Sequence, residues 1–298
     1  MNLAILGQSN AARIESNEEA LSEFGSDTVS FSAKGGSALL KSNASTPDNY
    51  WINETSQGKF IDGPLLVAAM GLLQSAAPDN IIWIQGEQDA TRISGLEGRK
   101  LHKSALKYLF DRFLEYCDQV NIVTIGRRLQ DKDKGFHNIR MALIDTAKEM
   151  QDVKVISHAY TLELEDVVHY SHDAQVLLCR EIVTKLSFTD YDLGVKPIDT
   201  KTYTRAIDVT MDNSMVDNIG SKSHKLFSIR DVDGNLLQSP TSIAQLSALK
   251  VRLTFSSEPI KQYLCTCAGQ LDGIESNSGL WVKNDNGEHL QPSMIRIK

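Results

Sequence analysis

Short apolar runs alternate with longer segments of helical periodicity up to about residue 190, and this alternation constrains the fold more than any other feature of the chain. Aliphatic and β-branched residues dominate the runs at 3–6, 28–32, 81–84, 120–125 and 153–157. Helix formers at helical spacing stand at 63–77, 99–116, 138–150 and 173–187. Strands that alternate with helices pair in parallel, with helices on both faces. We therefore expect an α/β layer structure whose ligands sit beyond the carboxyl ends of the strands.

The pattern changes after the segment DYDLGVKP at 190–197. Helical periodicity gives way to the β-rich runs RAIDVTM, KLFSIRD, ALKVRLTF and QYLCTCA, which the turn signals DVDG, SSEP and NDNG separate. Short strands joined by such turns are typical of antiparallel sheets. We predict two domains, an α/β domain at 1–197 and a small all-β sandwich at 198–298.

Composition narrows the possible partners and the location. Of 298 residues, 41% are apolar, which suffices for a sizeable core. The formal net charge is -7, without a long basic run, so nucleic acid is not expected as a partner. No run approaches the roughly 20 apolar residues of a membrane span, and the start lacks the features of a secretory signal. As it stands, we expect a cytoplasmic chain, or one that joins a phage particle or is secreted by another route.

The four cysteines show no metal-type spacing. They are Cys117, Cys179, Cys265 and Cys267. We expect structural thiols rather than a disulfide or a metal site.

The stretch GQSN at 7–10 follows the first predicted strand, before any helix begins. Ser9 has two interpretations. A small polar residue at this place caps the next helix. Alternatively, it is a nucleophile at a strand end, where the start of a helix supplies backbone N–H groups. A nucleophilic serine needs a base, and histidine is the side chain that most often fills this role.

Asp166 and His169 stand three residues apart in EDVVHYSHDAQ, just before the predicted helix at 173–187. On one turn, this spacing lets the carboxylate bind the ring nitrogen that faces away from a substrate, which fixes the tautomer and stabilises the imidazolium. Taken alone, the pair also fits a surface turn. His172 is the rival base, but it has no carboxylate three residues upstream.

Two further loops follow predicted strands and carry groups suited to holding an oxyanion. The glycines of AKGGS at 33–37 let a backbone N–H approach a ligand closely, and a plain turn has the same composition. The segment IQGEQD at 84–89 places polar side chains directly after a buried strand. Because the carboxyl ends of parallel strands share one edge of a sheet, we expect the four loops to converge there.

These segments resemble, in order and context, the blocks of the SGNH (GDSL-like) hydrolases. GQSN, GGS at 35–37, WIQGEQDA at 83–90 and DVVH at 166–169 are similar in particular to the sialate O-acetylesterase and carbohydrate acetylesterase branch. The resemblance covers roughly residues 1 to 190. It implies a flavodoxin-like three-layer sandwich with a central parallel sheet of about five strands. The α/β-hydrolase elbow G-x-S-x-G does not match, because Ala11 takes the place of its second glycine.

Carried over residue by residue, the resemblance implies a triad with Ser9 as nucleophile, His169 as base and Asp166 as its orienting acid. Two departures lie nearby. Cys179 stands near a position where many members have glycine, and Ala11 replaces a methionine common after GQSN. Neither removes a catalytic group, but both leave the shape of the acyl pocket open.

The resemblance also implies an oxyanion hole. The backbone N–H groups of Ser9 and of Gly36 (or Gly35) would line it, completed by an amide side chain. We assign that amide to Gln85, with Gln88 as the alternative.

Candidate substrate contacts surround these groups. Arg13 falls where the branch often has an arginine, so it either touches the sugar or covers the first helix. Tyr50 and Trp51 fit stacking on a sugar face as well as local packing. Glu87 is a further candidate, although with Asp89 it is expected mainly to brace the loops.

The implied activity is that of a serine esterase, which removes acetyl groups from sialic acid or an acetylated polysaccharide through an acetyl-enzyme, without metal or cofactor. The alternatives are a lipid esterase or thioesterase on the same fold, or a carbohydrate-binding module with a decayed site. In the second domain, Trp281 and Tyr263 are candidate carbohydrate contacts, and a structural or oligomerising role is the alternative.

Overall fold

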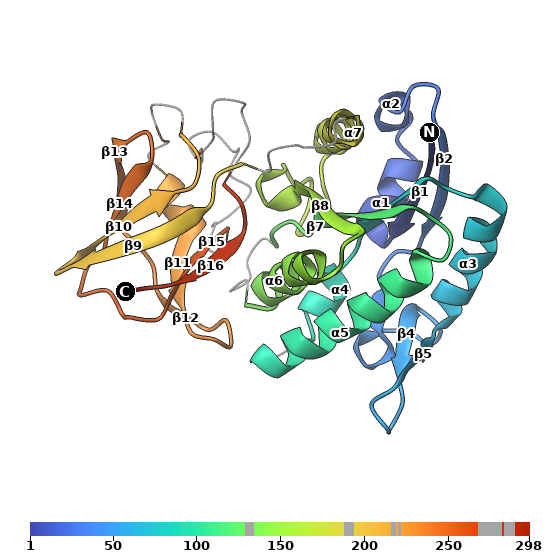
Figure 1. Ribbon diagram of the computed structural model, residues 1–298, viewed down its shortest axis with the longest axis horizontal. Helices are drawn as coiled ribbons and strands as arrows, with labels where there is room; N and C mark the ends of the chain where they lie inside the picture. Colours follow the sequence, from blue (N-terminus) through green and yellow to red (C-terminus); the bar gives the residue numbers. More distant parts are fainter. Residues whose placement is uncertain are drawn as a thin grey trace.

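The computed structural model describes residues 1–93, 95–128, 134–187, 194–215, 219, 222–267, 282 and 290–298. It consists of an α/β part and a β part that lie next to each other (Figure 1). Trp281, a candidate carbohydrate contact, lies outside the described residues.

The α/β part is built on a five-stranded parallel sheet. Its strands are β1 (Asn2–Gly7), β2 (Thr28–Ala33), β6 (Asn80–Ile84), β7 (Gln119–Thr124) and β8 (Val153–His158). They lie in the order β2-β1-β6-β7-β8, and every neighbouring pair is parallel. This is the flavodoxin-like order, in which the strand order reverses at β1, so that a crevice opens between the ends of β1 and β6.

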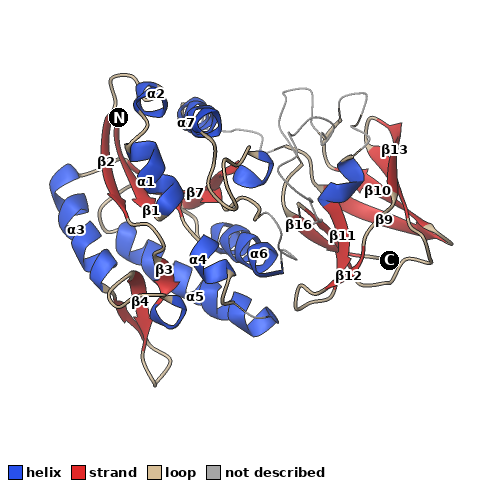
Figure 2. Ribbon diagram, turned by 180° about the vertical axis from the view of Figure 1, so that it is seen from behind, coloured by secondary structure: helices blue, strands red, loops and turns tan. Residues whose placement is uncertain are grey.

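Helices cover both faces of this sheet, because its strands present alternate apolar side chains to either side. One face packs against α3 (Pro64–Ala76), α5 (Gly95–Phe113) and α6 (Lys134–Glu149). The other packs against α1 (Ser9–Glu15), α2 (Glu18–Ser22) and α7 (His172–Leu186), which Figure 2 shows from behind. In β1, for example, Leu6 joins the first core and Ile5 the second.

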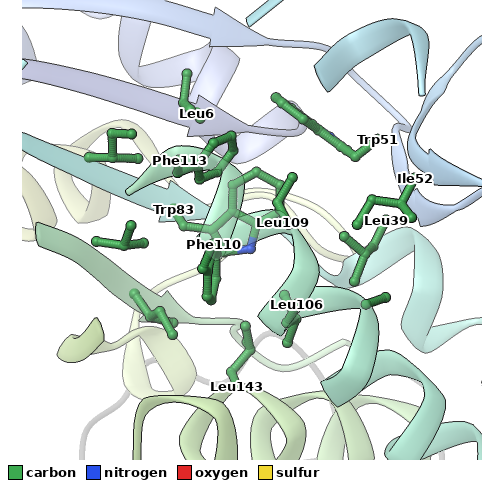
Figure 3. Close-up of a cluster of buried hydrophobic side chains, with 14 of the residues drawn as sticks. Leu6, Leu39, Trp51, Ile52, Trp83, Leu106, Leu109, Phe110, Phe113 and Leu143 are labelled. Carbon is green, nitrogen blue, oxygen red and sulfur yellow. The ribbon is translucent and has the colours of Figure 1, made fainter. Parts of the chain in front are cut away.

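Aromatic rings fill the centre of the first core (Figure 3). Trp51 and Trp83 meet edge to face with ring centroids 5.0 Å apart, and Phe113 lies 5.7 Å from Trp83. Trp51 belongs to a small second sheet, which consists of β3 (Ala38–Leu40), β4 (Tyr50–Glu54) and β5 (Phe60–Asp62). The sequence did not predict this sheet, because its short strands carry too little periodicity.

The β part contains two antiparallel sheets of four strands each among the described residues. One comprises β9 (Pro197–Tyr203), β10 (Ala206–Met211), β13 (Ser242–Ser247) and β14 (Lys250–Thr254). The other comprises β11 (Phe227–Arg230), β12 (Leu236–Gln238), β15 (Tyr263–Thr266) and β16 (Ser293–Arg296). Buried side chains of both sheets, such as Val209 and Ile229, share one core.

The two parts meet at the turn that joins β11 to β12. A side-chain oxygen of Asp233 in this turn accepts a hydrogen bond from the N–H of Leu96, in the first turn of α5, at 3.0 Å. The carbonyl of Asp233 accepts a second bond from Asn138 Nδ2 of α6 at 3.1 Å. Lys134, which begins α6, donates to Asn235 at 2.7 Å. The hairpin therefore rests on the first turns of two helices of the α/β part (Figure 1).

The expected fold class is confirmed, both for the central parallel sheet with helices on its two faces and for the antiparallel sheets that follow. In the ranges that the structure describes, no helix combines the length and the apolar character needed to cross a membrane.

Candidate active site

Ser9 is the first residue of α1, directly beyond the carboxyl end of β1. The strand ends at Gly7, where φ is +153° and an added Cβ would lie 1.9 Å from the carbonyl oxygen of Ile84. The N–H of Gln8 donates to the same oxygen at 3.0 Å. Only glycine permits this approach, which seats the GQSN loop against the end of β6, at the crevice of the sheet.

Asp166 and His169 form a hydrogen-bonded pair on the turn between η2 (Ala159–Thr161) and α7. Asp166 Oδ2 lies 2.7 Å from His169 Nδ1. Asp166 Oδ1 accepts the backbone N–H groups of Val168 and His169, each at 2.9 Å. Because Nδ1 binds the carboxylate, Nε2 is the ring nitrogen left to accept a proton from a nucleophile.

Asp166 is ionised throughout the physiological pH range. Partial burial opposes its ionisation, but hydrogen bonds from the Val168 N–H and from His169 outweigh this effect and lower the pKa of Asp166 to about 2. The side chain remains 44% exposed. A carboxylate that stays charged can orient the His169 imidazole and stabilise its cation.

Asn10 brings the Ser9 and His169 loops together. Its side chain is 1% exposed, accepts the Tyr170 N–H at 3.2 Å and donates to the Val168 carbonyl at 3.4 Å. These two residues flank His169, and Asn10 follows Ser9 in the chain. Among the hydrogen bonds of the described residues, none joins Ser9 Oγ to the His169 ring. Catalytic hydrogen bonds are often loose in ligand-free sites and tighten around a substrate.

Two backbone N–H groups at this edge are available to a ligand. Within the described part of the chain, neither the N–H of Ser9 nor that of Gly36 has a backbone acceptor. Gly36 adopts a left-handed conformation, with φ +65°, in the turn after β2. Lys34 N–H and Ser37 Oγ both donate to the Gly7 carbonyl, at 3.2 and 3.3 Å, which fixes the glycine turn beside the GQSN loop.

The burial of Gln85 contradicts its assignment as the third oxyanion donor. The side chain is 0% exposed, and its Nε2 donates to Asp89 Oδ2 at 2.6 Å and to the Ser37 carbonyl at 3.3 Å. Both amide hydrogens are thus engaged inside the protein. Gln88, the alternative, is half-buried, and its Nε2 donates one hydrogen to the Asn43 carbonyl at 3.2 Å. The second hydrogen of Gln88 is left for a ligand.

Glu87 and Asp89 lie in the one-turn helix α4 (Glu87–Ala90) and brace the loops around it. Asp89 accepts the Leu39 N–H at 2.7 Å and Asn43 Nδ2 at 2.8 Å. Glu87 Oε1 accepts Asn10 Nδ2 at 2.7 Å. Burial raises the pKa of Glu87, and the hydrogen bond from Asn10 opposes that effect. At 4% exposed, Glu87 does not face a ligand, which corrects the expectation that it contacts substrate.

Arg13 lies one turn of α1 beyond Ser9 and binds two acidic side chains. Its guanidinium forms a close ion pair with Glu165, and Nη2 lies 3.7 Å from Asp166 Oδ2. This is the oxygen that binds His169. Arg13 therefore places positive charge beside the carboxylate that binds His169.

A cavity of about 460 Å³ opens next to Arg13, and polar side chains dominate its lining. The lining residues are Arg13, Ser16, Asn17, Glu18, Glu19, Glu165, His172 and Gln175. His172 Nε2 lies 3.1 Å from Glu19 Oε2 in this lining. The rival base therefore belongs to the cavity, whereas His169 is the histidine paired with Asp166.

Trp51 is a core residue, which corrects the expectation that it stacks on a sugar. It is 1% exposed and packs against Trp83 (Figure 3). Tyr50 is half-buried, with the ammonium of Lys41 5.6 Å from its ring centroid. Tyr263 of β15 is also half-buried. The two tyrosines stay candidates for contact with a ligand.

Among the described residues, no group of three or more His, Cys, Asp and Glu side chains is placed to hold a metal ion. The four cysteines are free thiols. Burial raises the pKa of Cys117, Cys179 and Cys265 to about 12. These three thiols are therefore protonated and unreactive at neutral pH.

The comparison with protein families matches the segment that carries two of the motifs. Residues 51–187 fit the family described as carbohydrate esterase, sialic acid-specific acetylesterase. This range includes the QGE segment and the Asp166–His169 pair. A comparison with curated proteins finds no significant match.

Several solved structures are similar to this chain at low sequence identity, and the first of them shares its fold. A carbohydrate acetylesterase from Xanthomonas citri gives a TM-score of 0.62 at 13% identity, over 95% of this chain and 64% of that one. A family two carbohydrate esterase from Cellvibrio japonicus has a TM-score of 0.44 at 16% identity, and the match covers 62% of this chain and 59% of that one. A lipase/acylhydrolase from Enterococcus faecalis has a TM-score of 0.42 at 14% identity, and the match covers 64% of this chain and 100% of that one. The chain thus spans less than two thirds of the first two proteins.

The fold is similar to that of the carbohydrate acetylesterase structure from Xanthomonas citri. The family match, over residues 51–187, is to carbohydrate esterases, which are carboxylic ester hydrolases.

Sequence reasoning missed Asn10 and Tyr170, whose contact holds the first and last motif segments together. The only local signal was the asparagine that ends GQSN. Its partner lies 160 residues away, a distance over which no pattern in a single sequence points to a contact.

Proposed function

We propose that the protein is a serine esterase that removes O-acetyl groups from a carbohydrate, either sialic acid or an acetylated polysaccharide. The observation that carries this proposal is the bond between Asp166 and His169 Nδ1 at 2.7 Å, which leaves Nε2 for the proton of Ser9. The carbohydrate esterase match of residues 51–187 supports a sugar ester as substrate.

The reaction proceeds in two steps. His169 Nε2 accepts the proton of Ser9 Oγ while this oxygen attacks the acetyl carbonyl carbon. The tetrahedral intermediate collapses as its bond to the sugar oxygen breaks, and His169 returns the proton to that oxygen. A water molecule, deprotonated by the same histidine, then attacks the acetyl-enzyme. The bond between the acetyl carbon and Ser9 Oγ breaks, Oγ takes the proton back from His169, and acetate is released.

The negative charge of the tetrahedral intermediate falls on the former carbonyl oxygen. The N–H groups of Ser9 and Gly36 support its stabilisation, because they lack backbone acceptors in the described chain. We assign the third donor to Gln88, since Gln85 is buried. In known esterases and proteases, one such donor is worth about 3–4 kcal/mol of transition-state stabilisation.

Acetate release tests the proposal. Wild type and Ser9→Ala are incubated with O-acetylated sialic acid, acetylated xylan, p-nitrophenyl acetate and p-nitrophenyl octanoate. We expect wild type to release acetate from at least one sugar ester and to ignore octanoate, and Ser9→Ala to be inactive while it remains folded. Preference for octanoate would indicate a lipid esterase, and a folded wild type inactive on every ester would overturn the proposal.

A further inference from the structure

The amide of Asn10 is the point at which three motif segments meet. Its Nδ2 donates to Glu87 Oε1 at 2.7 Å and to the Val168 carbonyl at 3.4 Å, and its Oδ1 accepts the Tyr170 N–H at 3.2 Å. The shortest of the three bonds is the one to Glu87. Of the three partners, the Glu87 carboxylate therefore does most to fix the orientation of the Asn10 amide.

Glu87 is buried in a way that is unusual for a side chain with a purely structural role. It is 4% exposed, and its second oxygen, Oε2, has no hydrogen-bond partner. A buried carboxyl group with an unused oxygen is costly compared with a neutral amide or an apolar side chain. Packing alone does not account for a buried polar side chain at this place.

The neighbours of Glu87 connect it to the proposed base. Its carboxylate lies within electrostatic range of His169 and of the buried Tyr170 hydroxyl. Through Asn10 it is also linked to both residues that flank His169 in the chain. Glu87 cannot touch a substrate, since it is buried, so any effect on the reaction passes through these neighbours.

We propose that Glu87 is a positioning residue, which fixes the Asn10 amide and thereby holds the His169 loop in register with Ser9. The inference rests on the proposed function, because it assigns His169 and Ser9 their roles. In this arrangement Asp166 sets the tautomer and rotation of the imidazole, while Glu87 sets the place of the loop that carries it.

Variants at two positions test the chain of contacts. Glu87→Gln keeps an oxygen that accepts from Asn10, whereas Glu87→Ala removes it. With p-nitrophenyl acetate, we expect Glu87→Gln to keep most of kcat. We expect Glu87→Ala to lose about 10²-fold in kcat with KM unchanged, the size of effect that a displaced catalytic group produces.

A double-mutant cycle separates action through Asn10 from an independent effect. We expect Asn10→Ala to lower kcat as well, and the double variant Asn10→Ala with Glu87→Ala to be no slower than Asn10→Ala alone. If the kcat losses of the two single variants multiply in the double variant, the inference is overturned. Wild-type kcat in Glu87→Ala would overturn it as well.

Asn121→Ala is the matched control for loss of a buried polar side chain. Asn121 is fully buried in the middle of β7 and donates to Asn80 at 3.0 Å, near the amino ends of the strands. We expect it to lower the melting temperature while kcat stays at the wild-type level. An inactive folded wild type would refute the proposed function itself, whereas an active wild type with unaffected Glu87 variants would refute only the role of Glu87.

Discussion

The side chain of Asn10 accepts a hydrogen bond from the backbone N–H of Tyr170 at 3.2 Å, although 160 residues separate the two. The first and the last motif segments are thus joined by an amide that takes no part in bond making. The same amide binds Glu87 in the third segment. The approach of Ser9 to His169 therefore depends on a small buried side chain next to one of them.

The two glutamines of the third segment should respond differently to truncation. Gln88→Ala is expected to lower kcat about 10²–10³-fold, the usual loss for one oxyanion donor, with little change in stability. Gln85→Ala should instead lower the free energy of unfolding by about 1–3 kcal/mol, because it leaves the buried Asp89 carboxylate short of a donor. Steady-state kinetics and urea unfolding of both variants provide the check. The reverse pattern would restore Gln85 as the donor.

Arg13 should influence the site only modestly. Its ion pairs with Glu165 and Asp166 are partly exposed, so Arg13→Ala should change stability by less than about 1 kcal/mol. We expect kcat to fall less than about tenfold, since Asp166 keeps its hydrogen bonds to the His169 loop. Kinetics on a sugar ester, with Arg13→Lys as the charge-preserving control, test this prediction. A large rise in KM that Arg13→Lys does not rescue would indicate direct contact with the sugar.

Glu87 should make stability depend on pH in a direction unusual for a carboxyl group. Its pKa is raised above the value of about 4.3 in an unfolded chain, so the native state binds the proton more tightly. The contribution of neutral Glu87 is fully present below about pH 4 and is lost as pH rises through the raised pKa. Glu87→Gln mimics the neutral form. Its urea midpoint should match wild type at pH 4 and exceed it at pH 8, and equal midpoints at both values would contradict the prediction.

Gly7 should tolerate no side chain. In Gly7→Ala the new Cβ would meet the Ile84 carbonyl, and the alanine would have to adopt a φ of +153°. We expect a loss of about 2–4 kcal/mol, from overpacking together with backbone strain. Gly25→Ala is the control, because Gly25 also has a positive φ, +60°, but open space around it. Thermal unfolding should show a clearly smaller shift for Gly25→Ala, of about 1 kcal/mol.

The central strands of the parallel sheet were predictable because they are runs of apolar residues buried on both faces, as in IIWI of β6, whereas the edge strand β2 is only half-buried and was predicted from its β-branched and aromatic residues. The long helices α3, α5, α6 and α7 were predictable from their periodicity. The helix α4 was not, since it spans a single turn and is held by tertiary contacts, whereas α1 was expected only from its place after GQSN. The strands β3, β4 and β5 are likewise too short for their periodicity to predict a sheet.

Within the site, the pairing of Asp166 with His169 was predictable from their spacing together with the family resemblance, because both partners lie on one turn. The direction of a side chain was a different matter. Trp51 points inward because it packs against Trp83, a partner that only the folded chain brings close. Gln85 binds Asp89, four residues further along the chain, but the short segment between them shows no periodicity that would predict which way the amide points.

The turn between β11 and β12 caps the N-terminus of α5, a helix in the other part of the protein. Asp233 accepts the Leu96 N–H at the start of α5, a role that a residue of the helix's own N-terminus normally fills. Melting of the β part would therefore leave α5 frayed at its first turn and release the Asn138 and Lys134 contacts to α6. The sequence pattern changes near residue 197, but these three contacts should couple the unfolding of the β part to that of the α/β part.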